Sequence, residues 1–173
     1  MSVLIFAELD EGKLKKSSQE AIFYGAKVAG MLGTSATAIV LGTADDGELA
    51  LAGRYGATRV LHADDTKLNE PNGMAYATVV AAAAQQEGSK VIVLAKSSLA
   101  DAMTARLAGK LKAGLAANVI ELPDLSNGFQ VKTSIYTGKA FAYNNLKADV
   151  KILAIKKNTI APQETDATAT VES

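Results

Sequence analysis

Residues 91–111 read VIVLAKSSLADAMTARLAGKL, an unbroken apolar run followed by an amphipathic stretch. The run is continuous rather than alternating, which is typical of a strand that is covered on both faces of a sheet. The following stretch carries an apolar residue at every fourth position, namely Leu99, Met103, Leu107 and Leu111. This spacing predicts a helix with one apolar side. A strand that leads directly into a helix is the repeating unit of a parallel α/β sheet.

The same unit recurs through the first half of the chain. Three other apolar runs predict strands: Val3-Leu4-Ile5-Phe6, Ala38-Ile39-Val40-Leu41 and Val60-Leu61. Helices are predicted over residues 17–32, 44–54 and 72–87, the first with Ser17 and Glu20 at capping-box spacing. The alternation predicts an α/β fold with a doubly wound, mostly parallel sheet. Ligands bind such sheets where the strand order reverses, here expected between residues 3–6 and 91–94.

The pattern changes after Gly114. Residues 116–122 predict a strand, residues 123–128 a turn, and residues 129–136 alternate apolar with polar side chains. Two more strands are predicted over 141–147 and 150–155, so we expect antiparallel strands added at the C-terminal end. Residues 158–173 are rich in Ala, Thr and acidic side chains, which predicts a flexible linker after a domain of residues 1–157.

The composition bounds the kinds of site that the chain can build. It has 173 residues, with 18 basic and 18 acidic side chains, no Trp, no Cys and one histidine. This balance gives no general attraction to nucleic acid or anionic lipid, and the missing cysteines exclude disulfides and thiolate sites. No apolar run approaches the roughly 20 residues of a membrane span, and the N-terminus lacks a basic leader. We therefore expect a cytoplasmic protein.

One candidate anion site follows the strand at residues 91–94. The segment Lys96-Ser97-Ser98-Leu99-Ala100-Asp101 begins a helix, whose free N–H groups attract anions. The alternative is that one serine simply caps the helix, and we favour it because capping alone explains these residues.

A second candidate is a set of acidic residues at strand ends: Glu8, Asp10, Glu11, Asp64 and Asp65. Carboxylates gathered there could hold Mg²⁺ and accept a phosphoryl group, as in a phosphoacceptor receiver domain. The receiver pattern also expects a lysine at the end of its fifth strand, where this chain has Leu122-Pro123. Solvated loop acids are therefore the favoured interpretation.

Other polar residues carry less specific signals. His62 has no partner in the sequence pattern, so we expect a packed or surface histidine rather than a general base. Arg106 and Lys110 flank the apolar side of the fourth helix, as surface cations or as contacts for a partner subunit. The chain has no phosphate-binding P-loop, no Gly-x-Gly-x-x-Gly and no Gly-x-Ser-x-Gly. We therefore predict no catalytic, cofactor-binding or metal-binding residue.

Several segments together resemble the alpha subunit of electron-transfer flavoproteins, over residues 2–157. They are Val3 to Glu8, Leu41-Gly42, Tyr55-Gly56-Ala57, the series Ser97, Ala100, Arg106, Leu107, Ala108 and Leu111, and Thr133 to Ala140. The last segment reads TSIYTGKA where the family has Arg-x-Ile-Tyr-Ala-Gly-Asn-Ala. This chain departs from the family at Thr133, Thr137 and Lys139, and at Ala100-Asp101-Ala102 before the helix arginine.

The resemblance implies a nucleotide-binding-like fold of the adenine nucleotide alpha hydrolase-like kind, whose own site has decayed. It implies a support domain, not an enzyme, in an alpha/beta heterodimer that carries FAD mainly in a C-terminal domain beyond this chain. The heterodimer would pass electrons from dehydrogenases, such as the acyl-CoA dehydrogenases of fatty acid beta-oxidation, to a quinone reductase or another acceptor. Fold-level analogy alone is a weak warrant for function, so a universal-stress-protein-like nucleotide-binding module and the receiver domain stay as alternatives.

Overall fold

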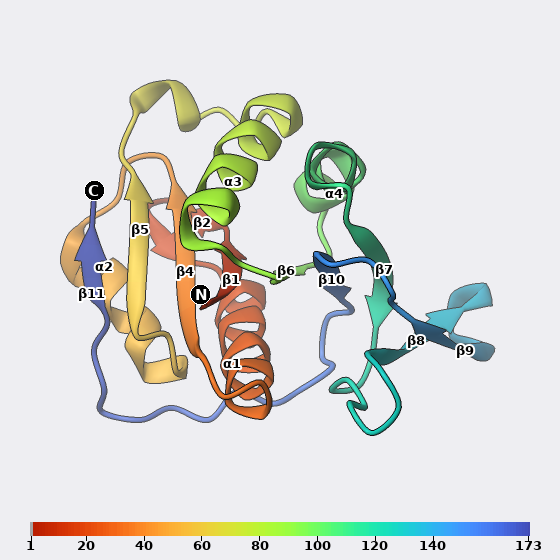
Figure 1. Cartoon of the computed structure of the whole chain (residues 1–173). Coiled ribbons are helices and arrows are strands. Elements are labelled where there is room, and N and C mark those ends of the chain that lie inside the picture. The colour runs from red at the N-terminus through yellow and green to blue at the C-terminus, as the bar shows by residue number, and fades with distance from the viewer. Residues whose placement is uncertain (1) are drawn as a thin grey trace.

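The computed structural model describes residues 2–173 and contains a nine-stranded sheet in the order β11-β5-β4-β1-β6-β10-β7-β8-β9 (Figure 1). Its strands are β1 Ser2–Ala7, β4 Ser35–Leu41, β5 Arg59–Ala63, β6 Val91–Ala95, β7 Gly114–Val119, β8 Gln130–Ile135, β9 Ala140–Asn145, β10 Lys151–Ile155 and β11 Thr170–Glu172. The helices are α1 Lys16–Met31, α2 Asp46–Ala50, α3 Gly73–Glu87 and α4 Ser98–Leu111, with 3-10 turns η1 Leu51–Tyr55, η2 Thr66–Leu68 and η3 Tyr136–Gly138. A separate small hairpin joins β2 Leu9–Asp10 to β3 Lys13–Leu14.

The centre of the sheet confirms the doubly wound, parallel arrangement. All six residues of β1 are buried, and β1 pairs in parallel with β4 on one side and β6 on the other. The chain therefore runs outward from β1 through β4 to β5 and then returns to β6, so the strand order reverses between β1 and β6 as predicted.

Helices cover both faces of this sheet (Figure 1). Val3 and Ile5 of β1 pack in one apolar cluster with residues of α1 and α2, whereas Leu4 and Phe6 pack in another with residues of α3 and α4. This division follows from the pleat, which sends successive side chains to opposite faces. The α1 helix lies so close to the sheet at Gly25 that a Cβ built on this residue would come within 2.4 Å of Ile5 Cγ1.

The expected antiparallel extension is confirmed for two strands only. β8 pairs antiparallel with β7 and β9. The prediction that residues 150–155 belong to this extension was wrong, because β10 lies between β6 and β7 and is parallel to both. Four of its five residues are buried. An unbroken apolar strand of this kind is stable only where helices cover both faces, which is the middle of the sheet.

The composition of residues 158–173 predicts a flexible linker, but the structure places this segment against the domain. It crosses the molecule and ends in β11, which pairs in parallel with β5 (Figure 1). Glu20 holds its start, since the carboxylate accepts hydrogen bonds from the backbone N–H groups of residues 158–160. The capping-box prediction was therefore also wrong: α1 has no side-chain cap, and Glu20 is used for this long-range contact.

Candidate functional site

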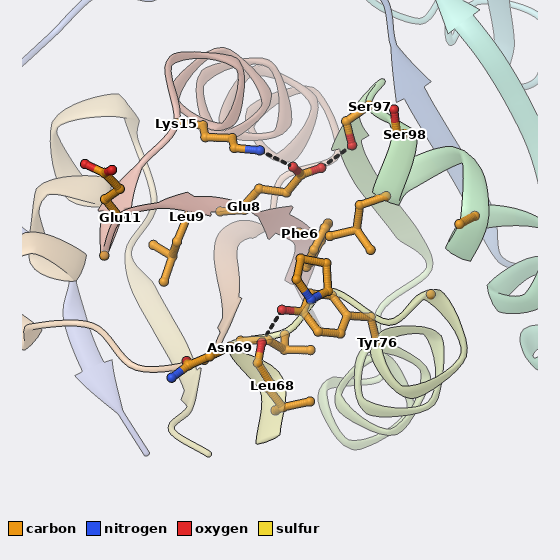
Figure 2. A pocket seen from close by; sticks show the side chains of 18 of the residues that line it. Phe6, Glu8, Leu9, Glu11, Lys15, Leu68, Asn69, Tyr76, Ser97 and Ser98 are labelled. Carbon is orange, nitrogen blue, oxygen red and sulfur yellow. Dashed lines mark hydrogen bonds and ion pairs between the residues drawn. The ribbon is translucent and has the colours of Figure 1, made fainter. Parts of the chain in front are cut away.

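A cleft of about 870 Å³ opens where the strand order reverses, at the carboxyl ends of β1, β4 and β6 (Figure 2). Its walls come from the ends of these strands, the β2–β3 hairpin, η2 and the first turns of α3 and α4. The volume lies within the range of roughly 300–1,000 Å³ that is usual for small-molecule sites. This is the place where a doubly wound sheet normally binds its ligand.

The carboxylate of Glu8 occupies one side of the cleft, and its side chain is only 9% exposed. One carboxylate oxygen forms an ion pair with Lys15 Nζ at 2.9 Å, and the other accepts the hydroxyl hydrogen of Ser97 (Figure 2). The Glu8 backbone N–H donates to Ser18 Oγ at 2.7 Å. Both carboxylate oxygens are thus paired with groups of the chain itself, which offsets the cost of burying the charge.

Ser97 acts as the helix cap that the sequence favoured. It is the N-cap residue of α4, and its Oγ accepts a hydrogen bond from the Ala100 N–H at 3.0 Å. The same hydroxyl donates to Glu8, so the cap also ties α4 to the end of β1. Lys96 lies 3.7 Å from Asp101 in an exposed ion pair. Neighbouring Ser98 lines the cleft.

The opposite wall is aromatic and is held by hydrogen bonds. The rings of Phe6 and Tyr76 meet edge to face with centroids 5.9 Å apart. Tyr76 donates its hydroxyl hydrogen to the carbonyl of Leu68, and burial together with the charge of Glu8 raises the pKa of this hydroxyl. Asn69 Oδ1 accepts the N–H of Thr43 at 2.7 Å, which fixes the loop beside the cleft.

The acidic residues of the second candidate do not gather into one site. Glu8 and Glu11 line the cleft, whereas Asp65 caps η2 by accepting the N–H of Lys67 at 2.9 Å. Within residues 2–173, no group of three or more Asp, Glu or His side chains is arranged to hold a metal ion. Nothing in this geometry supports the receiver-domain alternative.

The remaining candidates lie outside the cleft. His62 is 5% exposed, its Nε2 lies 2.8 Å from the Gly42 carbonyl, and its Nδ1 lies 3.8 Å from the Asp46 carboxylate. It is the packed histidine that the sequence suggested. Arg106 is exposed and donates to the Ala102 carbonyl on its own helix, and Lys110 is exposed near the end of α4.

Sequence reasoning missed Lys15, Tyr76 and Asn69 as cleft residues. Lys15 reaches the cleft because Glu11 and Gly12, with φ values of 50° and 78°, form the tight turn of the β2–β3 hairpin. Asn-Gly and Asp-Gly are the usual signals for such a turn, and Glu11 stands at the first position here, so the sequence did not indicate it. The backbone N–H of Lys15 indeed donates to the Glu8 carbonyl at 3.1 Å.

The cleft does not fit the diphosphate of FAD, the cofactor that the resemblance implies. An anion at this edge of the sheet would use the N-terminus of α4, where Ser97 already binds the Glu8 carboxylate. Glu11 adds a second negative charge to the lining, and of the two lining lysines, Lys15 is already paired. The chain is therefore a doubly wound α/β domain that has its own carboxylate in the cleft where such sheets bind ligands.

Comparison with known proteins agrees with this class and specifies it. The chain belongs to the electron transfer flavoprotein domain family, whose model matches residues 3–173. This is a family of electron carriers, as its description states.

Three relatives illustrate the similarity. The chain is 26% identical to the electron transfer flavoprotein subunit alpha of Bacillus subtilis, over 95% of this chain and 50% of that protein. It is 32% identical to protein FixB of Clostridium saccharobutylicum, over 73% of this chain and 38% of that protein. It is 30% identical to an acryloyl-CoA reductase electron transfer subunit beta of Anaerotignum propionicum, over 69% of this chain and 33% of that protein. The chain thus spans about half the length of these relatives or less.

Within residues 2–173, no helix is long and apolar enough to cross a membrane.

Proposed function

We propose that this chain is the N-terminal support domain of an electron-transfer flavoprotein alpha subunit. Its role is to pack against a beta subunit and to carry a C-terminal domain that binds FAD. The intact heterodimer then passes electrons from dehydrogenases, such as those acting on acyl-CoA, to a quinone reductase or another acceptor in the cytoplasm.

The observation that carries this proposal is the combination of the family match with the negatively charged lining of the cleft. The match to the family runs through residues 3–173 but covers only half of an alpha subunit's length. Over that length, the Glu8 carboxylate lines the cleft at the position expected for an anion, with Lys15 and Ser97 as its partners. A domain with this arrangement supports a neighbouring flavin site and supplies none of its own.

Residues 158–173 lead in this proposal toward the flavin domain. They are anchored by Glu20 at one end and by β11 at the other, which fixes their course along the domain.

Reconstitution tests the proposal. The chain is mixed with the beta subunit, and then with a separately expressed C-terminal half of the alpha subunit, and each mixture is analysed by size-exclusion chromatography with absorbance at flavin wavelengths. We expect a complex with the beta subunit without flavin absorbance, and one flavin per complex once the C-terminal half is added. Failure of the chain to bind either component would refute the proposal.

A further inference from the structure

The loop between β7 and β8 presents an Asn-Gly pair to solvent. Two backbone hydrogen bonds between Asp124 and Gln130, at 2.8 and 3.0 Å, close this loop. Asn127 and Gly128 lie at its tip, where both are exposed, and Gly128 has a φ of 99°. Such a pair is typical of a turn, and this one lies in the turn predicted over residues 123–128.

The side chain of Asn127 and the backbone nitrogen of Gly128 are both available for reaction. Within residues 2–173, neither the Asn127 carboxamide nor the Gly128 N–H has a hydrogen-bond partner. Glycine has no side chain to shield its nitrogen, and its backbone has more conformational freedom than that of any other residue. The Gly128 nitrogen can therefore approach the carboxamide carbon of the residue before it.

A second Asn-Gly pair in the same chain is held in place. Asn72 is the N-cap residue of α3, and its Oδ1 accepts the N–H groups of Met74 and Ala75 at 3.0 and 3.1 Å. The following Gly73 lies so close to α4 that a Cβ built on it would come within 2.9 Å of Ala102 Cβ. The first turn of α3 thus has little room to move, and the Asn72 carboxamide must leave its cap before it can react.

We propose that Asn127 is a site of spontaneous covalent modification, at which the asparagine is converted through a cyclic imide into isoaspartate and aspartate. The Gly128 nitrogen gives its proton to solvent and forms a bond to Asn127 Cγ, while the bond from Cγ to Nδ2 breaks and ammonia leaves. One water molecule then opens the imide. Attack at the former backbone carbonyl gives isoaspartate, whose main chain runs through Cγ, and attack at Cγ gives aspartate. Water is consumed, ammonia is released, nothing is oxidised or reduced, and one negative charge is added.

The modification acts on the contact that ties this loop to β9. Asn145 Oδ1 accepts the Phe129 N–H at 3.2 Å, and Asn145 Nδ2 donates to the backbone carbonyl of Asn127 at 3.3 Å. The loop packs tightly here, since a Cβ built on Gly128 would come within 2.8 Å of Asn145 Oδ1. Isoaspartate adds one carbon to the main chain at this point and turns the bonded carbonyl into a carboxylate. The Asn145 contacts must therefore shift, which lowers the stability of the loop.

Incubation of the purified full chain at neutral pH tests the proposal, with one portion native and another unfolded in guanidinium chloride. Brief digestion at mildly acidic pH and mass spectrometry measure deamidation at Asn72 and Asn127 separately. An isoaspartyl methyltransferase, with S-adenosylmethionine as the methyl donor, detects isoaspartate. The test variant is Asn127→Ser. The matched control is Asn72→Ser, which keeps a hydroxyl at the N-cap of α3.

In the native chain, we expect Asn127 to deamidate with isoaspartate among the products, and Asn72 to react at least about five-fold more slowly, because its cap must first open. In guanidinium chloride the two sites should react at similar rates. Asn127→Ser should remove nearly all the isoaspartate that forms in the native chain, and Asn72→Ser should leave it unchanged. An unmodified Asn127 in the native chain, or equal native rates at the two sites, would overturn the proposal.

The thermal stability of the product tests its structural consequence. Ion-exchange chromatography separates the modified chains, which carry an added negative charge. They should melt about 2–4 °C below the unmodified protein, as expected for the loss of one hydrogen bond in a domain of this size. The variant Asn127→Asp carries the same charge without the extra main-chain carbon and should melt as the wild type does. Modified chains that melt as the wild type does would overturn the conclusion that the reaction loosens the Asn145 contacts.

Discussion

Replacing Glu20 by alanine should release the C-terminal segment from the domain. The carboxylate accepts three backbone N–H groups, from residues 158, 159 and 160, at distances of 2.5–3.1 Å. Glu20 is 7% exposed, so these amides lose their acceptor in a site that water reaches poorly. Hydrogen bonds to a charged group contribute about 1.5–3 kcal/mol each, but three bonds to one carboxylate do not add fully.

We therefore expect Glu20→Ala to lower the free energy of unfolding by about 3 kcal/mol. Glu20→Gln keeps one carbonyl acceptor and should cost about half as much. The loss of stability cannot exceed the free energy with which residues 158–173 dock on the domain, because this segment can detach while the sheet stays folded. Detachment should also lower the urea m-value, since less surface is then buried in the native state.

Urea unfolding and hydrogen exchange measure the two consequences separately. The amides of residues 158–172, including those of β11, should lose protection in Glu20→Ala, while those of β1 and β6 keep it. Glu70→Ala is the control, because Glu70 is an exposed glutamate, and it should stay within about 0.5 kcal/mol of the wild type. Unchanged protection of the segment together with unchanged stability would refute the anchoring role of Glu20.

Three further substitutions test the packing of the sheet and of the cleft. Gly25→Ala places a Cβ within 2.4 Å of Ile5 Cγ1 and should destabilise the domain by roughly 1–3 kcal/mol in urea titrations; a neutral effect would mean that α1 can move away from β1. Tyr24→Phe should cost about 1 kcal/mol at pH 7, since its hydroxyl donates to a backbone carbonyl at 2.7 Å. Burial raises the pKa of the Tyr24 hydroxyl, so above about pH 10 this group ionises readily only in the unfolded state. The wild type should therefore lose stability as the pH rises above about 10, and Tyr24→Phe should lose less. Parallel pH profiles of stability for the two proteins would contradict this. Ser97→Ala removes the cap on Ala100 N–H and should cost about 0.5–2 kcal/mol in thermal melts, whereas an unchanged melting temperature would show that the cap is dispensable.

The sequence predicted the strands and helices that are determined by the apolar spacing within their own residues. The strands at residues 3–6, 38–41 and 91–94, and the helices that follow them, lie where their apolar spacing indicated. The reversal point between the first and fourth strands was also predictable, because it follows from the alternation of strands and helices. The prediction that one serine caps this helix depends on local contacts and is confirmed, with Ser97 as the cap.

The features that the sequence could not place depend on contacts between distant residues. The apolar run of β10 follows the hairpin in the chain, yet it lies between β6 and β7, and no local pattern states which strands it pairs with. β11 is held by main-chain pairing, which leaves no compositional signal in Thr170–Glu172. Glu20 looked like part of a capping box because its spacing from Ser17 fits that motif, whereas its partners lie 138–140 residues further along the chain.

The pairing of Glu8 inside the cleft likewise could not be predicted from the sequence pattern. Glu8 appeared there as one loop acid among several. The structure shows that Glu8 is paired in the cleft with Lys15 and Ser97, which come from different parts of the fold. These contacts place a paired carboxylate at the end of β1, where a phosphate group would meet negative charge.

Titration of the purified chain with FAD, followed by flavin fluorescence and by absorbance after gel filtration, tests the account most directly. With the Glu8 carboxylate paired to Ser97, the N-cap residue of α4, the chain should elute without yellow colour and leave the fluorescence of added FAD unchanged at micromolar concentrations. Retention of one flavin per chain, in a protein made of these residues alone, would contradict the conclusion that this domain supports a cofactor site located elsewhere.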